Sequence, residues 1–98
     1  MYGLIGKMRA KAGKRDDLLA ILLKGTDAMP GCLNYIIAKD PTDADVIWIT
    51  EVWDSQASHK ASLTLPQVRA AIAEAMPIIA GFDSSTPTEP VGGVGLPR

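Results

Sequence analysis

The residues that could do chemistry gather around one segment, Val46–Trp53. This run of β-branched and aromatic residues carries Glu51 and both tryptophans, and the only histidine of the chain, His59, follows shortly after it. Histidine is the side chain whose ordinary pKa lies nearest neutrality, so it is a natural general base. A carboxylate among apolar neighbours must be paired or protonated, so Glu51 could orient that imidazole or bind a ligand hydroxyl. The segment therefore indicates a pocket, with a histidine and a carboxylate as its candidate reactive groups.

Each of these candidates also has an ordinary structural interpretation. His59 could be a packing histidine at the rim of a helix, and Glu51 could form an ion pair with Lys7 or Arg9. Trp48 could line a pocket for an aromatic ligand, or it could simply pack in a core or an interface.

The hydrophobic pattern predicts the elements that must position these side chains. Strands are expected at 2–10, 32–39 and 46–53 and within 78–90, and helices at 14–28, at 54–63 and from Pro66 to Pro77. This β-α-β-β-α-β order matches the split βαβ, or ferredoxin-like, motif. We therefore predict an α+β fold in which an antiparallel sheet carries helices on one face only. Residues 1–90 would form one domain and residues 91–98 a flexible tail.

The Val46–Trp53 strand is apolar on both of its faces, with Trp48 on one side and Glu51 on the other. The predicted helices cover only one face of the sheet, and an exposed apolar face is a surface for association. We therefore predict a homodimer in which two sheets face each other and close a dimeric α+β barrel.

Composition excludes several classes of protein. The net charge of −1 over 98 residues provides no basic stripe for nucleic acid, and the basic run from Lys7 to Arg15 is typical of solvated charge. A single cysteine, Cys32, excludes an internal disulfide and a multi-cysteine metal site. No segment approaches the roughly 20 apolar residues of a membrane span. We expect a cytoplasmic protein with no membrane partner.

Four short motifs, in order and with similar spacing over residues 2–90, resemble the antibiotic biosynthesis monooxygenase (ABM) family. The nearest likeness is to its small quinol-monooxygenase-like members. The motifs are KAGK at 11–14, PGCLNY at 30–35, EVWDS at 51–55, and Ser62-Leu63 ahead of Pro66. The resemblance implies a dimeric α+β barrel with a pocket in each subunit, between sheet and helices. It also implies cofactor-independent oxygenation of electron-rich phenols or hydroquinones.

Oxygenation without a flavin or a metal makes a specific demand on the protein. Dioxygen is a triplet, so a closed-shell substrate must first become easy to oxidise, and removal of a phenolic proton achieves this. We predict that His59 is the base, that Tyr35, Trp48, Glu51 and Ser62 shape the substrate site, and that neither a cofactor nor a metal takes part.

The chain departs from the family at positions that matter. Many members place a histidine where this chain has Ser62, and often a second one where it has Gln67. Haem-degrading relatives use asparagine, tryptophan and histidine at positions aligned with Gly6, Ser62 and Ile72, so haem chemistry is not expected. If the family histidine is required for proton removal, Ser62 favours a second hypothesis, a dimeric barrel that binds a small apolar ligand without turnover. An isomerase or decyclising relative is a third option.

Overall fold

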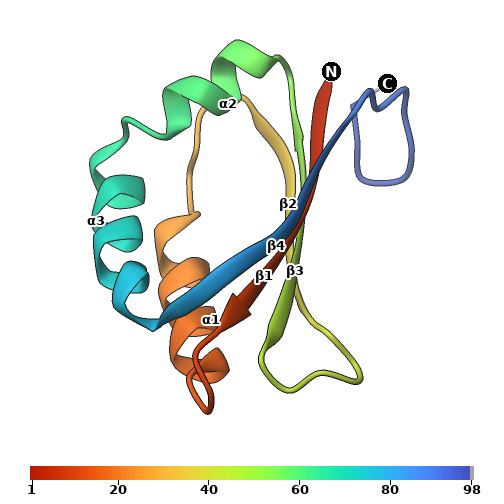
Figure 1. Ribbon diagram of the computed structural model, residues 1–98. Coiled ribbons are helices and arrows are strands. Elements are labelled where there is room, and N and C mark those ends of the chain that lie inside the picture. The colour runs from red at the N-terminus through yellow and green to blue at the C-terminus, as the bar shows by residue number, and fades with distance from the viewer. Residues whose placement is uncertain (98) are drawn as a thin grey trace.

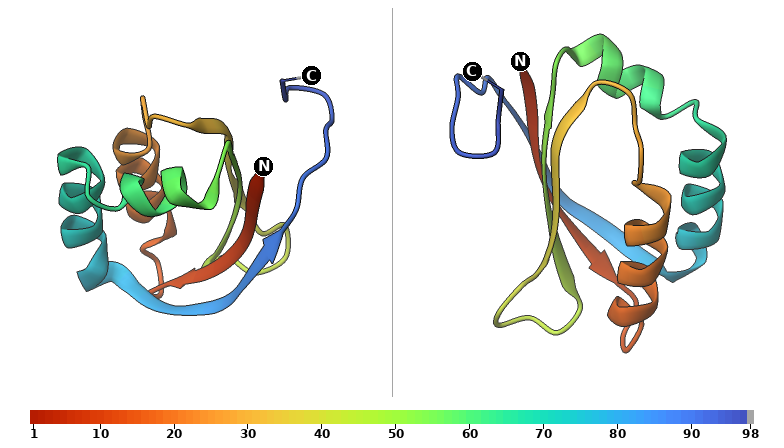
Figure 2. Two further views of the ribbon diagram at one scale, coloured as in Figure 1. Left: turned by 90° about the horizontal axis from the view of Figure 1, so that it is seen from above. Right: turned by 180° about the vertical axis from the view of Figure 1, so that it is seen from behind.

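Four strands form one antiparallel sheet in the computed structural model, which describes residues 1–97 (Figure 1). The strands are β1 (Tyr2–Ala10), β2 (Cys32–Lys39), β3 (Val46–Trp53) and β4 (Ile79–Thr88), in the spatial order β2-β3-β1-β4. The helices are α1 (Arg15–Gly25), α2 (Gln56–Ser62) and α3 (Pro66–Ala75), followed by the 3₁₀ turn η1 (Met76–Ile78). All three helices lie on the same side of the sheet (Figures 1 and 2). The predicted α+β, ferredoxin-like architecture is confirmed.

The first helix ends at Gly25, three residues before the predicted end. A Cβ atom at Gly25 would overlap the side chain of Ala71 on α3, so the missing side chain lets the two helices approach closely. The hydroxyl of Thr26 donates to the Leu22 carbonyl, and Ala28 takes a positive φ of 52°, which turns the chain out of the helix.

The start of α2 is fixed by two local contacts. Ser55 is its N-cap, and its Oγ accepts a hydrogen bond of 3.1 Å from the Ser58 amide. The Asp54 amide donates to the carbonyl of Gly31 over 2.9 Å, which ties this helix to the loop before β2. Gly31 has a φ of +80°, and a Cβ there would lie 2.6 Å from Cβ and Oγ of Ser58.

The core lies between sheet and helices and has two parts. The larger part is built around Leu18 and Ile47, which are both fully buried; the smaller part is built around Trp53, which is 1% exposed. Residues of both parts line a cavity.

The other sheet face has no helix over it (Figure 2). Ile36 and Ile5 are 54% and 39% exposed, and the Lys7 ammonium lies 5.3 Å from the ring centroid of Trp48. We call this surface the open face. None of the helices in residues 1–97 is long and apolar enough to cross a membrane.

Candidate functional site

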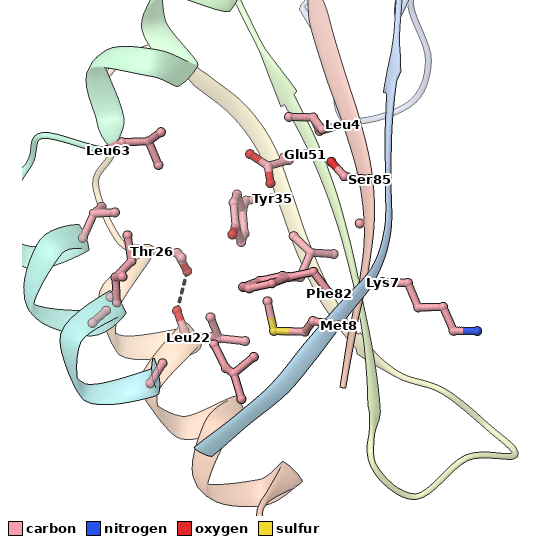
Figure 3. A pocket seen from close by; sticks show the side chains of 18 of the residues that line it. Leu4, Lys7, Met8, Leu22, Thr26, Tyr35, Glu51, Leu63, Phe82 and Ser85 are labelled. Carbon is pink, nitrogen blue, oxygen red and sulfur yellow. Dashed lines mark hydrogen bonds between the residues drawn. The ribbon is translucent and has the colours of Figure 1, made fainter. Parts of the chain in front are cut away.

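A cavity of about 380 Å³ lies between the sheet and the helices, within the size range of small-molecule sites (Figure 3). Its walls are mainly apolar side chains from β1, β3, α1 and α3. Six polar side chains also line it: Thr26, Tyr35, Glu51, His59, Ser84 and Ser85. Lys7 contributes to the wall, but its ammonium points away from the cavity (Figure 3). A neutral, mostly apolar molecule therefore suits this space better than an anion.

Glu51 and His59 meet at the edge of the cavity. His59 Nε2 lies 3.5 Å from Glu51 Oε1, and the two side chains are only 21% and 15% exposed. The same Glu51 oxygen accepts a 2.8 Å hydrogen bond from Trp53 Nε1. The buried indole of Trp53 thus anchors the carboxylate, and the carboxylate is placed to stabilise a protonated imidazole.

The alternative pairing of Glu51 with a strand-one cation is wrong. Strand alternation turns Lys7 and Arg9 to the open face, where Lys7 stacks on Trp48 and Arg9 forms ion pairs with two aspartates.

Two aromatic rings hold the imidazole of His59. Its centroid lies 5.5 Å from that of Tyr2 and 5.5 Å from that of Trp53, the latter in an edge-to-face arrangement. Tyr2 and Trp53 are cross-strand partners on β1 and β3, so they form one surface on which α2 rests. The short helix therefore turns His59 toward Glu51 and away from bulk solvent.

Tyr35 is half-buried on β2, directly across from Glu51 on β3. Burial, followed by the charge of Glu51, raises the pKa of the Tyr35 hydroxyl above its usual value. The hydroxyl therefore stays protonated at neutral pH and can donate a hydrogen bond to a ligand oxygen.

The structure does not bring Trp48 and Ser62 to the cavity. Trp48 lies on the open face, where its Nε1 donates to Asp40 over 2.8 Å. Ser62 is 4% exposed, and its hydroxyl donates to the backbone carbonyl of His59 over 2.6 Å. That hydroxyl is occupied within its own helix.

Two residues have roles at the site that we did not predict from the sequence, Trp53 as the partner of Glu51 and Phe82 in the cavity wall. Trp53 shares the face of Glu51 by simple alternation, so its role as the partner of that carboxylate had a signal in the sequence. Phe82 lines the cavity from β4, and no local pattern indicated it. Among residues 1–97, no group of three histidine, cysteine or acidic side chains is arranged to hold a metal ion.

Comparison with known proteins shows the family and the fold of the chain. A family model described as antibiotic biosynthesis monooxygenase matches residues 1–74. The chain is 61% identical to a protein of Chloroflexus aurantiacus J-10-fl that is proposed to be such a monooxygenase. That match covers 98% of both chains, with a TM-score of 0.95. A second structure, from Deinococcus radiodurans and proposed to have the same activity, is 26% identical over 96% of both chains, with a TM-score of 0.78. No curated protein matches the chain.

Proposed function

The chain belongs to the antibiotic biosynthesis monooxygenase family, and we propose that it is a cofactor-independent monooxygenase acting with O₂ on a small aromatic hydroquinone or phenol. The observation that carries this proposal is the Glu51–His59 pair at the edge of an otherwise apolar cavity. The pair offers a base and the negative charge that stabilises its protonated form, in a space suited to an aromatic ring.

The proposed reaction begins with proton transfer. His59 accepts the proton of a substrate hydroxyl, Glu51 stabilises the resulting imidazolium, and the Tyr35 hydroxyl donates to the substrate oxygen that carries the negative charge. The apolar walls keep water away from the electron-rich anion.

Electrons for the reduction of O₂ come from the substrate itself. The phenolate gives one electron to O₂, and the two radicals combine to form a C–O bond and a peroxide. Loss of water from the peroxide leaves one oxygen atom on the ring and releases the other. For a hydroquinone, the sum is hydroquinone plus O₂ to hydroxyquinone plus water. No external reductant is needed.

We also propose that two copies pair through the open face. Helices cover only one side of the sheet, and Ile5, Ile36 and Trp48 lie on the other side with part of their surface exposed. Pairing would bury these side chains and close the predicted barrel. Sedimentation at micromolar concentration tests this, and a 10 kDa species would contradict it. The cytoplasmic location stays a prediction.

A second candidate is ligand binding without turnover. It is favoured by Ser62, whose hydroxyl bonds to the His59 carbonyl and so provides no free base at the position where many relatives have histidine.

Oxygen uptake with a panel of hydroquinones separates the two candidates. His59→Ala should lower the rate about 10²- to 10⁴-fold, the range for loss of a general base. Lys60→Ala, on the same helix but exposed, is the matched control. With ¹⁸O₂, the product should carry one labelled atom. Equal rates for wild type and His59→Ala would remove His59 from the mechanism. Binding without oxygen uptake by any substrate would favour the second candidate.

A further inference from the structure

Strand β4 carries a bulge beside the cavity. Ser84 pairs with Lys7 and Phe82 pairs with Met8, so Asp83 has no partner on β1. Without the bulge, the residue opposite Met8 would be Asp83, and Phe82 would fall opposite Arg9 on the open face. The extra residue therefore moves Phe82 from one face of the sheet to the other.

Arg9 holds the bulge from the open face. Its Nη2 lies 3.1 Å from the carboxylate of Asp83, and its Nη1 lies 2.9 Å from that of Asp43 in the β2–β3 loop. Of these two contacts, the one with Asp83 lies at the bulge itself, and it favours the register that turns Phe82 inward.

Phe82 lies in the cavity but is not part of the core. Its ring extends toward the space below Tyr35 and next to Met8 (Figure 3), yet 65% of the residue is exposed. A large ring in this position is available to a ligand, because the fold does not use it for packing.

We infer that Phe82 selects aromatic over saturated ligands for this cavity, and that the Asp83 bulge and its ion pair with Arg9 aim the ring. The inference rests on the proposed function in taking the cavity as the substrate site. Aromatic rings attract each other in offset or edge-to-face geometry beyond simple burial of area. A saturated ring of similar size also buries apolar surface in the cavity, but it lacks this attraction between aromatic rings.

Titration calorimetry with 2-naphthol and its saturated analogue decahydro-2-naphthol tests the inference. Both are neutral and carry one hydroxyl group. Phe82→Leu should weaken binding of 2-naphthol about 3- to 10-fold and change binding of the saturated analogue little. The leucine keeps the apolar contact, but the attraction between two aromatic rings is lost. Because Phe82 is largely exposed, this variant should fold normally.

The bulge is tested by a matched pair of variants. Asp83→Lys repels Arg9 and should reduce the preference for 2-naphthol, whereas Asp43→Lys removes the other partner of Arg9 and should leave the preference nearly intact. Deletion of Asp83 should also keep the preference, because Phe82 then stays opposite Met8 in a regular ladder.

Three results would overturn the inference. If Phe82→Leu weakened the binding of both ligands equally, the ring would contribute only buried apolar surface area. If Phe82→Leu changed the sedimentation of the protein but not its binding of 2-naphthol, Phe82 would be a residue of an interface between copies instead. If the wild-type protein did not bind 2-naphthol, the cavity would not select aromatic ligands. The oxygenase proposal fails separately, if aromatic ligands bind but no hydroquinone consumes oxygen.

Discussion

Replacing Gly31 by alanine should destabilise the protein clearly more than replacing Gly13. Both glycines have a positive φ, +80° at Gly31 and +76° at Gly13. An alanine in this region costs about 1–2 kcal/mol, partly offset by about 0.4–1 kcal/mol from the lower entropy of the unfolded chain. These contributions are the same at both sites and cancel in the comparison.

The two sites differ in what a new Cβ would meet. At Gly13 nothing lies within 4 Å, whereas at Gly31 Cβ and Oγ of Ser58 lie at 2.6 Å and Oδ1 of Asp54 at 2.9 Å. Overpacking of this kind costs about 1–3 kcal/mol. We therefore expect Gly31→Ala to exceed Gly13→Ala by about 1–3 kcal/mol in the free energy of unfolding.

Urea unfolding followed by tryptophan fluorescence measures the difference. For a slope of about 1–2 kcal/mol/M, a difference of 2 kcal/mol separates the midpoints by about 1–2 M. Ser58→Gly should recover part of the loss in the Gly31→Ala background, because it removes the nearest atoms. If the urea midpoints of Gly31→Ala and Gly13→Ala coincided, the close approach of Gly31 to Ser58 would be refuted. Since Ser58 precedes His59, the same contact positions the base of the proposed site.

Three further outcomes are expected. The pKa of Asp40 lies well below its usual range, because the Trp48 indole and then backbone amides donate to the carboxylate. Such a group stabilises the fold above the unfolded pKa of about 3.9 and loses this effect as pH falls through the lower folded pKa. The melting temperature should therefore fall less steeply below about pH 4 in Asp40→Asn than in wild type; parallel curves would contradict this. Gly25→Ala should cost about 1–3 kcal/mol by urea unfolding and be rescued by Ala71→Gly, whereas additive effects would argue against helix contact. Ser55→Ala should cost about 1 kcal/mol for loss of the N-cap, and an unchanged midpoint would contradict that role.

Much of the fold could be predicted because its signals are local. The β-branched and aromatic residues at 46–53 predicted β3, and the alternation of its side chains placed Trp48 and Glu51 on opposite faces. Pro66 marked the first residue of α3. The predicted end of α1 lies three residues too far along the chain, and the close approach of Gly25 to Ala71, a residue far away in the sequence, was not predicted. Pattern alone cannot show such a contact.

The order of the elements, the two faces of the strand at 46–53 and the presence of one histidine close to a carboxylate among apolar neighbours can be read from the sequence alone. These follow from backbone periodicity, which depends on near neighbours. Three features could be seen only in the folded protein: His59 meets Glu51, Trp53 anchors this carboxylate, and Phe82 enters the cavity. These depend on how α2 rests on the sheet and on one unpaired residue in β4, which are set by packing and register between distant segments.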